Sequence, residues 1–260
     1  MLNSLNTSAT GMTAQVKQTE VISNNIANAD TVSFKRSRAD FQDLLYQTDK
    51  GPGSATSATT TNPTGVQTGL GVKVTGVTRE YKQGSARPTG RDLDVMIGGD
   101  GFFSVQLPTG EVAYTRDGNW KLDGEGRVVT GEGFPIIPEV IVPPETRRLT
   151  VAPDGTFQAE ITPNDVQQLG QIQLTTFMNP SGLSAEGSNL FRQTPASGEA
   201  VTGNPGEQGF GRLQNQYLEA SNVNSVAEMT ELIRAQRLFE MNSKVMQTSD
   251  QMLGTLNQVK

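Results

Sequence analysis

The N-terminal segment places apolar residues at intervals of three and four, the spacing that puts side chains along one face of an α-helix. These positions are Leu2, Leu5, Ala9, Met12, Val16 and, after a polar break, Ile26. Gly11 weakens this helix by about 1 kcal/mol relative to Ala. Residues 28–31, Asn-Ala-Asp-Thr, compete for backbone hydrogen bonds, so we expect the helix to end there.

A second helix is predicted from Ser225 to about Val259, because this segment contains one Gly and no Pro. Ser225 and Glu228 have the spacing of a capping box, in which each side chain accepts a hydrogen bond from an unpaired backbone N–H. One apolar stripe comprises Met229, Leu232, Phe239, Met246 and Leu253. An adjacent stripe comprises Leu238, Met241, Val245, Met252, Leu256 and Val259. This sector is wider than a two-stranded seam, so the helix is expected to have more than one neighbour.

The middle of the chain alternates apolar and polar residues over short runs that are separated by turn signals. Residues 92–97 and 102–107 read as strands on either side of the turn Gly98–Gly101. Asp-Gly pairs at 117, 123 and 154 are typical of hairpin turns. The spacing of these signals favours a β-sandwich or a barrel-like domain.

Glycine and proline are confined to this middle region. All 13 Pro lie between Pro52 and Pro205, and only Gly11 and Gly254 of the 28 Gly lie outside 51–211. Both residues interrupt helices, so their distribution predicts helical ends around a β-rich centre. We therefore expect an α+β fold, mainly β, in three parts. They are a helical terminal domain formed by 1–45 and 215–260, an extended polar arm or linker at 46–75, and a β-rich domain at 76–214.

Composition removes several classes of function. The chain has no Cys and no His, which excludes disulfides, thiolate or imidazole catalysis and Cys- or His-based metal sites. The formal net charge of −6 argues against nonspecific nucleic-acid binding. No apolar stretch is long enough to span a membrane, and the N-terminus does not have the pattern of a cleaved signal peptide.

Few residues suggest chemistry. Asp92 and Asp94 could form a carboxylate pair for acid–base catalysis, which would make the chain a β-rich carbohydrate-active enzyme, but such pairs are common in turn-rich regions. Residues 123–127 lack the acidic ligand that completes a calcium loop, and the Gly98–Gly101 turn lacks the Lys and the helix of a phosphate-binding loop. The pattern therefore predicts no catalytic, cofactor or metal site.

The apolar faces of the two helices allow two interpretations. They pack within the chain, or they pack between chains, and the polar segments that separate them from the β region favour contacts between chains. The predicted self-assembly interface comprises Leu2, Leu5, Met12, Val16, Ile22, Ile26, Met229, Leu232, Ile233, Phe239, Val245, Met252, Leu253 and Leu256.

Residues 22–36, ISNNIANADTVSFKR, resemble the N-terminal signature of the bacterial flagellar rod and hook family, approximately NNxANxxTxGFK. The matching positions here and near the C-terminus are Asn24, Asn25, Asn28, Phe34, Lys35, Asn222 and Asn224. Further similar segments are 41–48, 94–103, 114–118, 218–224, 231–237 and 242–244. The chain departs from the signature at Ser33, where the family usually has Gly, so the departure concerns a local turn with positive φ before Phe34.

The resemblance implies a structural subunit of the flagellar rod, which assembles into a helical tube across the periplasm and transmits torque from motor to hook. In that family the terminal helices pair as a coiled coil inside the tube and a β domain lies outside. Residues 46–70 correspond to the segment that distinguishes a straight rod from a bending hook.

The implied partners are copies of the chain itself, proximal rod proteins, hook-side proteins, the surrounding ring proteins and the flagellar type III export apparatus. Export is expected without a cleaved signal peptide, and no nucleic acid, cofactor or membrane insertion is expected. Two alternatives stay open, a proximal rod or hook member of the same family, and a monomeric binding module of the adhesin type.

Overall fold

A computed structural model describes residues 2–51, 64–162 and 165–258, except for the side chains of Leu2 and residues 256–258. The chain divides into two compact units. The helical unit comprises 1–27, 37–79 and 224–260, and the β-rich unit comprises 28–36 and 80–223. The three domain ranges expected from the sequence stay a prediction. The described part of the expected arm belongs to the helical unit up to Arg79.

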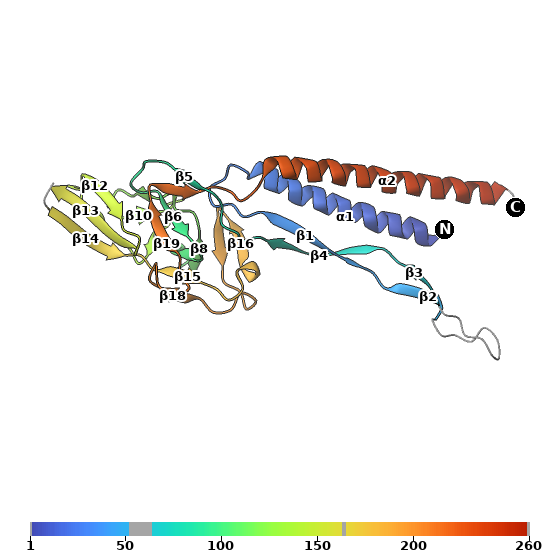
Figure 1. The fold of residues 1–260 in the computed structure, drawn as a ribbon, viewed down its shortest axis with the longest axis horizontal. Coiled ribbons are helices and arrows are strands. Elements are labelled where there is room, and N and C mark those ends of the chain that lie inside the picture. The colour runs from blue at the N-terminus through green and yellow to red at the C-terminus, as the bar shows by residue number, and fades with distance from the viewer. Residues whose placement is uncertain (1, 52–63, 163–164, 259–260) are drawn as a thin grey trace. The chain divides into compact units, whose positions relative to one another are not determined.

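The helical unit contains helices α1 (Leu2–Ala27) and α2 (Ser225–Gln258), which lie side by side in an antiparallel arrangement (Figure 1). Both predicted helices are thereby confirmed within the described residues. The predicted capping box is wrong, because the side-chain oxygen of Asn224 accepts the N–H groups of Val226 and Ala227 at 3.1 and 3.2 Å. The cap is therefore Asn224, one residue earlier than expected.

In the described part of the chain, neither helix has a stretch apolar enough to cross a membrane.

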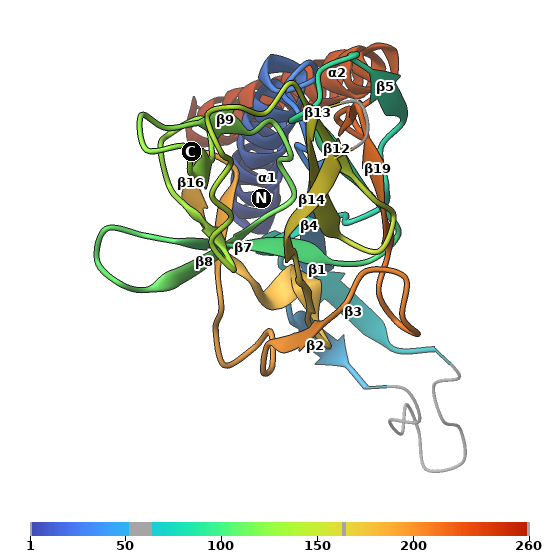
Figure 2. The same cartoon turned by 90° about the vertical axis from the view of Figure 1, so that its left-hand side faces the viewer.

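A two-stranded ribbon completes the helical unit. Its strands are β1 (Ser37–Asp43), β2 (Tyr46–Lys50), β3 (Val66–Gly69) and β4 (Val72–Arg79), with β1 antiparallel to β4 and β2 antiparallel to β3. Helix α1 lies between α2 and the β1–β4 pair in both views (Figures 1 and 2). The predicted arm is thus an exposed ribbon where the structure describes it, and residues 52–63 lie outside the described residues.

The β-rich unit is built from short strands joined by turns. They are β5 (Ala86–Pro88), β6 (Val95–Gly98), β7 (Phe102–Gln106), β8 (Val112–Thr115), β9 (Lys121–Leu122), β10 (Val128–Val129), β11 (Ile136–Ile137), β12 (Arg148–Val151), β13 (Thr156–Thr162), β14 (Asp165–Gln171), β15 (Leu174–Thr176), β16 (Ser184–Gly187), β17 (Leu190–Arg192), β18 (Val201–Gly203), β19 (Arg212–Asn215) and β20 (Tyr217–Glu219). A short 3₁₀ helix spans Pro180–Gly182.

The strands form open sheets. The main sheet has the order β16-β17-β8-β7-β15-β18 with β11 also paired to β7, and a second sheet has the order β12-β13-β14 (Figure 2). The pairs β6–β19, β5–β20 and β9–β10 are separate. The prediction of a mainly β chain with helical ends is confirmed. The barrel-like alternative is wrong for the described strands, since their sheets end at free edges, and the sandwich stays a prediction.

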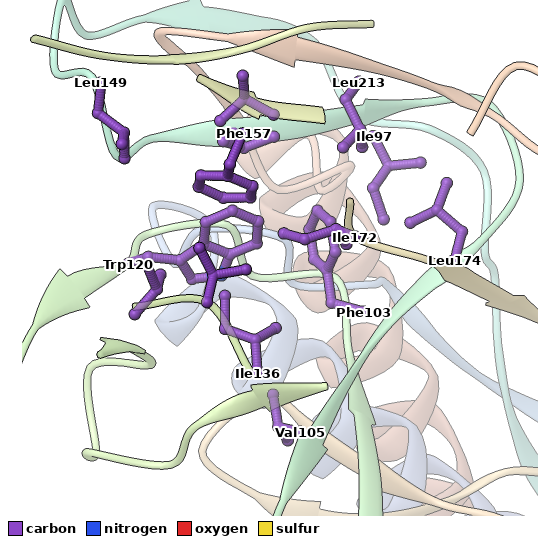
Figure 3. Packing of buried hydrophobic residues seen from close by; sticks show 14 of the residues in the cluster. Ile97, Phe103, Val105, Trp120, Ile136, Leu149, Phe157, Ile172, Leu174 and Leu213 are labelled. Carbon is purple, nitrogen blue, oxygen red and sulfur yellow. The ribbon is translucent and has the colours of Figure 1, made fainter. Parts of the chain in front are cut away.

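The core of the β-rich unit lies on both faces of β7. Phe103 and Val105 point into a cluster with Trp120 and Phe157, as Figure 3 shows, and neighbouring Phe102 points into a second, smaller aromatic cluster. The rings of Phe103 and Trp120 meet edge to face with centroids 4.8 Å apart. Successive strand residues point to opposite faces, so the Phe-Phe pair connects the two clusters.

We expect Phe103→Ala to lower the free energy of unfolding of the β-rich unit by about 3–5 kcal/mol, because it removes a fully buried ring and leaves a cavity. Val166→Ala, at a side chain that is 59% exposed, should change it by less than about 0.5 kcal/mol. Chemical denaturation followed by Trp120 fluorescence measures both, and equal effects would contradict this assignment of the core.

Candidate functional site

Part of the predicted interface lies on the outer surface of the helix pair. Six of its residues are 40–54% exposed although their side chains are large and apolar. They are Val16, Met229, Ile233, Phe239, Val245 and Met252. Val226 and Met241 on α2 are also exposed, at 73% and 53%. Neither residue was among the predicted interface residues, although Met241 belongs to the adjacent apolar stripe.

Other predicted interface residues are less accessible. Five are half-buried, namely Leu5, Met12, Ile26, Leu232 and Leu253. Ile22 is only 2% exposed, so it serves the packing of its own chain, and we remove it from the interface. The side chains of Leu2 and Leu256 lie outside the described residues.

A groove runs between the two helices at Val16 and Phe239. It has a volume of about 670 Å³. Its lining consists of Val16, Thr19, Glu20, Ser23, Gln236, Phe239 and Glu240. Val16 and Phe239 are the apolar members of this lining. Glu20 and Glu240 supply carboxylates, of which Glu20 forms an ion pair of 2.8 Å with Lys17. This surface can receive an apolar side chain that is accompanied by a cation.

The β-rich unit contains a buried cluster of three charged side chains. The Glu219 carboxylate accepts the Lys35 ammonium at 2.6 Å and Nε of Arg116 at 3.0 Å. It also accepts the Gly84 N–H at 2.8 Å. Each of the three charged residues is at most 4% exposed. A buried ion remains charged only with such partners, so the cluster ties the segment after α1 to β20 and to the end of β8.

The remaining donors of the two cations are also used. Lys35 Nζ donates to the Lys82 carbonyl at 2.9 Å, and the Arg116 guanidinium donates to the carbonyls of Gly99 and Gly101 at 2.9 and 3.2 Å. Burial opposes ionisation of Glu219, but Arg116 and Lys35 outweigh it, so the pKa of Glu219 lies below its usual value. The Glu219 side chain therefore stays ionised inside the protein.

The signature asparagines shape the points where the helices begin and end. Asn25 is 1% exposed and exchanges two hydrogen bonds with the backbone of Ser37, while its Nδ2 also reaches Glu228 Oε2 at 3.1 Å. Asn25 thereby joins the end of α1, the start of β1 and the start of α2.

Asn222 has a similar role within the β-rich unit. Its Oδ1 accepts the Arg36 N–H at 2.7 Å, and its Nδ2 donates to the carbonyls of Glu80 and Lys82. One amide thus joins its own segment to the backbone at Arg36 and at residues 80–82.

The other signature residues act locally or lie at the surface. Asn28 Oδ1 accepts the Thr31 hydroxyl at 3.1 Å in the turn that follows α1. The Phe34 carbonyl accepts the Asn222 N–H at 3.4 Å. Asn24 has an exposed side chain, and Asn224 caps α2 as described above. These positions build the framework and do not form a ligand site.

The turn before Phe34 is present although Gly is replaced. Ser33 has φ of 56°, in the left-handed region that Gly adopts most easily. Its N–H donates to the Glu219 carbonyl and its hydroxyl to the Arg116 carbonyl, both at 2.8 Å. These two buried hydrogen bonds offset the cost of the left-handed conformation in a residue other than Gly.

The carboxylate pair of the enzyme hypothesis is divided by the structure. Asp94 is 1% exposed and lies 3.6 Å from the Arg91 guanidinium. Asp92 is at the surface, where it accepts a hydrogen bond from Gln216 at 3.0 Å. A cavity of about 520 Å³ is lined by Asp92 and not by Asp94. The two acids therefore do not face a common substrate there.

Comparison with known proteins identifies three matched segments. Residues 5–35 match the family model of the flagella basal body rod protein. Residues 96–159 match the D1 domain of flagellar hook protein FlgE/F/G, and residues 214–259 match the C-terminal region of flagellar basal body rod FlgEFG proteins.

Full-length relatives agree. The flagellar basal-body rod protein FlgG of Caulobacter vibrioides is 48% identical, with 100% of both chains covered. FlgG of Bacillus subtilis is 40% identical, and the flagellar hook-basal body complex protein FlhP of the same organism is 31% identical, again with 100% of both chains covered.

We expect Glu219→Gln to lower the free energy of unfolding by about 3–5 kcal/mol, because it leaves two buried cations without their counter-charge. Glu111→Gln is the matched control, since Glu111 pairs with Arg192 at 2.9 Å but its side chain is 55% exposed, and it should cost less than about 1 kcal/mol. Urea denaturation distinguishes the two. A loss at Glu219 no larger than that at Glu111 would refute the role of the cluster.

The same carboxylate should make stability sensitive to acid. Because the folded-state pKa of Glu219 lies below the ordinary value of 4.5, its contribution is present above about pH 4.5 and is lost as the pH falls through the folded-state pKa. The free energy of unfolding of the native chain should therefore fall more steeply below this pH than that of the Glu219→Gln variant. Parallel curves between about pH 5 and about pH 2.5 would contradict this assignment.

Proposed function

The chain belongs to the FlgG family of flagellar basal-body rod proteins, and from this premise we propose that it polymerises into the helical tube of the distal rod through the outer faces of its helix pair. It is a structural protein of the basal body and not an enzyme. The family implies self-assembly and association with other rod and hook components.

The observation that carries the proposed contact is the apolar surface of α2. Met241, Val245 and Met252 follow one another at intervals of four and seven residues, so they share one side of α2, and they are 53%, 48% and 51% exposed. An amphipathic helix normally turns such residues toward a neighbour. Fully burying a side chain of this size contributes about 1.5–3 kcal/mol. A second copy that covers this face would supply the missing neighbour.

The geometry of a shaft follows from one such contact. A face on one subunit that binds a different face on the next repeats without closing, and the product is a helical filament. Two different faces are available on one unit, namely the groove at Val16 and Phe239 and the side of α2 that carries Met241, Val245 and Met252. In the proposed tube the paired helices act as a coiled coil in the inner layer.

Assignment to the distal rod is supported by the full-length relatives, which carry the name of the rod protein FlgG. Identity to the Bacillus subtilis rod protein FlgG exceeds identity to its hook-basal body complex protein FlhP. Torque transmission from motor to hook is the function of such a rod. The proposed partners are proximal rod proteins, hook-side proteins and the surrounding ring in the periplasm. Delivery by the flagellar export apparatus without a cleaved signal peptide is part of this proposal.

The double variant Val245→Asp, Met252→Asp tests the contact, because these two exposed residues are one heptad apart on the same side of α2. It should raise the concentration needed for polymerisation at least about tenfold, because two carboxylates would have to be buried without partners. Gln247→Asp is the control, since residue 247 is exposed on the side of α2 away from Val245 and Met252, and this variant should polymerise as the native chain does. Sedimentation and electron microscopy of the purified chain provide the measurement. Normal filaments from the double variant would refute the proposed interface.

A further inference from the structure

One row of contacts between α1 and α2 joins small and polar side chains at regular intervals. Ser4 Oγ lies 3.5 Å from Ser249 Oγ. A Cβ on Gly11 would meet Asn242 Nδ2 at 3.0 Å. Asn25 Nδ2 donates to Glu228 Oε2 at 3.1 Å. On α1 the residues of successive pairs are separated by 7 and then 14 positions. On α2 their partners have the same separations in the reverse direction, as expected for antiparallel helices.

This register places a fourth layer between the second and the third. Gln18 falls opposite Ala235, which is 2% exposed. Within the described residues, the buried Oε1 of Gln18 has no hydrogen-bond partner. The centre of the seam is therefore Ser against Ser, Gly against Asn, Gln against Ala and Asn against Glu.

On α2 the large apolar residues lie beside this polar row instead, whereas Val21 and Ile22 of α1 are buried. The large apolar residues on α2 follow the central layer by four residues, and they are half-buried or exposed. They are Leu232, Phe239, Met246 and Leu253. A simple apolar pattern would place this row at the centre. The structure places Ala235, Asn242 and Ser249 closer to α1 than the sequence pattern suggested.

A polar residue at the centre of a helix seam specifies register at a cost in stability. A slip of one heptad would move Glu228 away from Asn25 by about 10 Å along the helix. The buried Glu228 carboxylate, 1% exposed, would then lose the amide donor of Asn25. The same slip would move Asn242 away from Gly11, whose missing side chain leaves room for it.

We propose that these four layers, which we call register keys, fix the axial register of α2 on α1 and its rotation about its own axis. The apolar residues beside the polar row then stay outside, where a second copy can cover them. The identity of that partner rests on the proposed function, whereas the register itself does not. A seam centred on the apolar rows would bury them within one chain and remove the surface that the next copy needs.

Cysteine cross-linking measures the register directly, because the chain has no native Cys. The variant Ser4→Cys, Ser249→Cys is oxidised as the free chain and after polymerisation. We expect a disulfide within one chain in both states, and the locked chain should polymerise as the reduced chain does. A disulfide between two chains, or a locked chain that fails to polymerise while its reduced form succeeds, would overturn the proposal.

The key itself is tested by Asn242→Leu in this cysteine background. The cross-linking rate should fall at least about threefold, because Leu favours an apolar seam in which the two introduced thiols no longer face each other. Gln247→Leu makes the same kind of change outside the seam and should leave the rate unchanged. An unchanged rate in the Asn242 variant overturns the register key. If the cross-linking rate falls in the Asn242 variant but no protein polymerises, not even the cysteine double variant with its thiols reduced, the register key is supported and the proposed rod function is refuted.

Discussion

The ion cluster at Glu219 is the constraint on which the course of the chain depends. The β-rich unit is inserted between the two helices in sequence, so the segment after α1 and the segment before α2 both have to be held in it. Lys35 lies in the segment that follows α1. Glu219 lies at the end of β20, the last strand before α2. Their charges are buried together with Arg116, and none of the three can be desolvated alone without a large penalty. The cluster therefore forms as a whole.

The helical unit is held by contacts that are weaker than these ion pairs but specify the register of the two helices. Its seam contains amides, hydroxyls and a Gly where an isolated helix pair would have Leu or Ile. Asn25 illustrates the trade between stability and specificity, because its one amide bonds Ser37 and Glu228 at the same time, and a one-heptad slip of α2 would break the hydrogen bond to Glu228. In the proposed rod, the apolar side chains left outside the seam are available to a neighbouring copy.

The sequence predicted the two helices and the β-rich centre, but it did not predict which side chains contact one another. The absence of Pro outside 52–205 predicted both helices, and the Asp-Gly turns predicted a β-rich centre, because these residues act through local backbone geometry. The α2 cap was misplaced by one residue, since Ser225 and Asn224 are both good caps and tertiary contacts decide between them. The Lys35–Glu219–Arg116 cluster joins residues far apart in sequence, so no local pattern announces it. Likewise, apolar spacing alone could not show that Ile22 is buried while Ile233 is exposed.

The buried ion cluster and the polar helix seam together are compatible with a stiff polymer, although the helix pair buries few large apolar side chains between its helices. A close-packed core such as that around Phe103 resists deformation within each subunit. Stiffness between subunits has to come from interfaces, and each half-exposed side chain of α2 adds to it only once it is covered. In a filament every copy makes the same contact, so a modest free energy per contact is repeated along the whole shaft. Repetition also makes the register important. If α2 slipped by one heptad along α1 in one copy, its contact residues would move by about 10 Å and would no longer match those of either neighbour. A seam that sacrifices apolar burial for a defined register is therefore compatible with a rigid rod, and a purely apolar seam that tolerated slippage would not be.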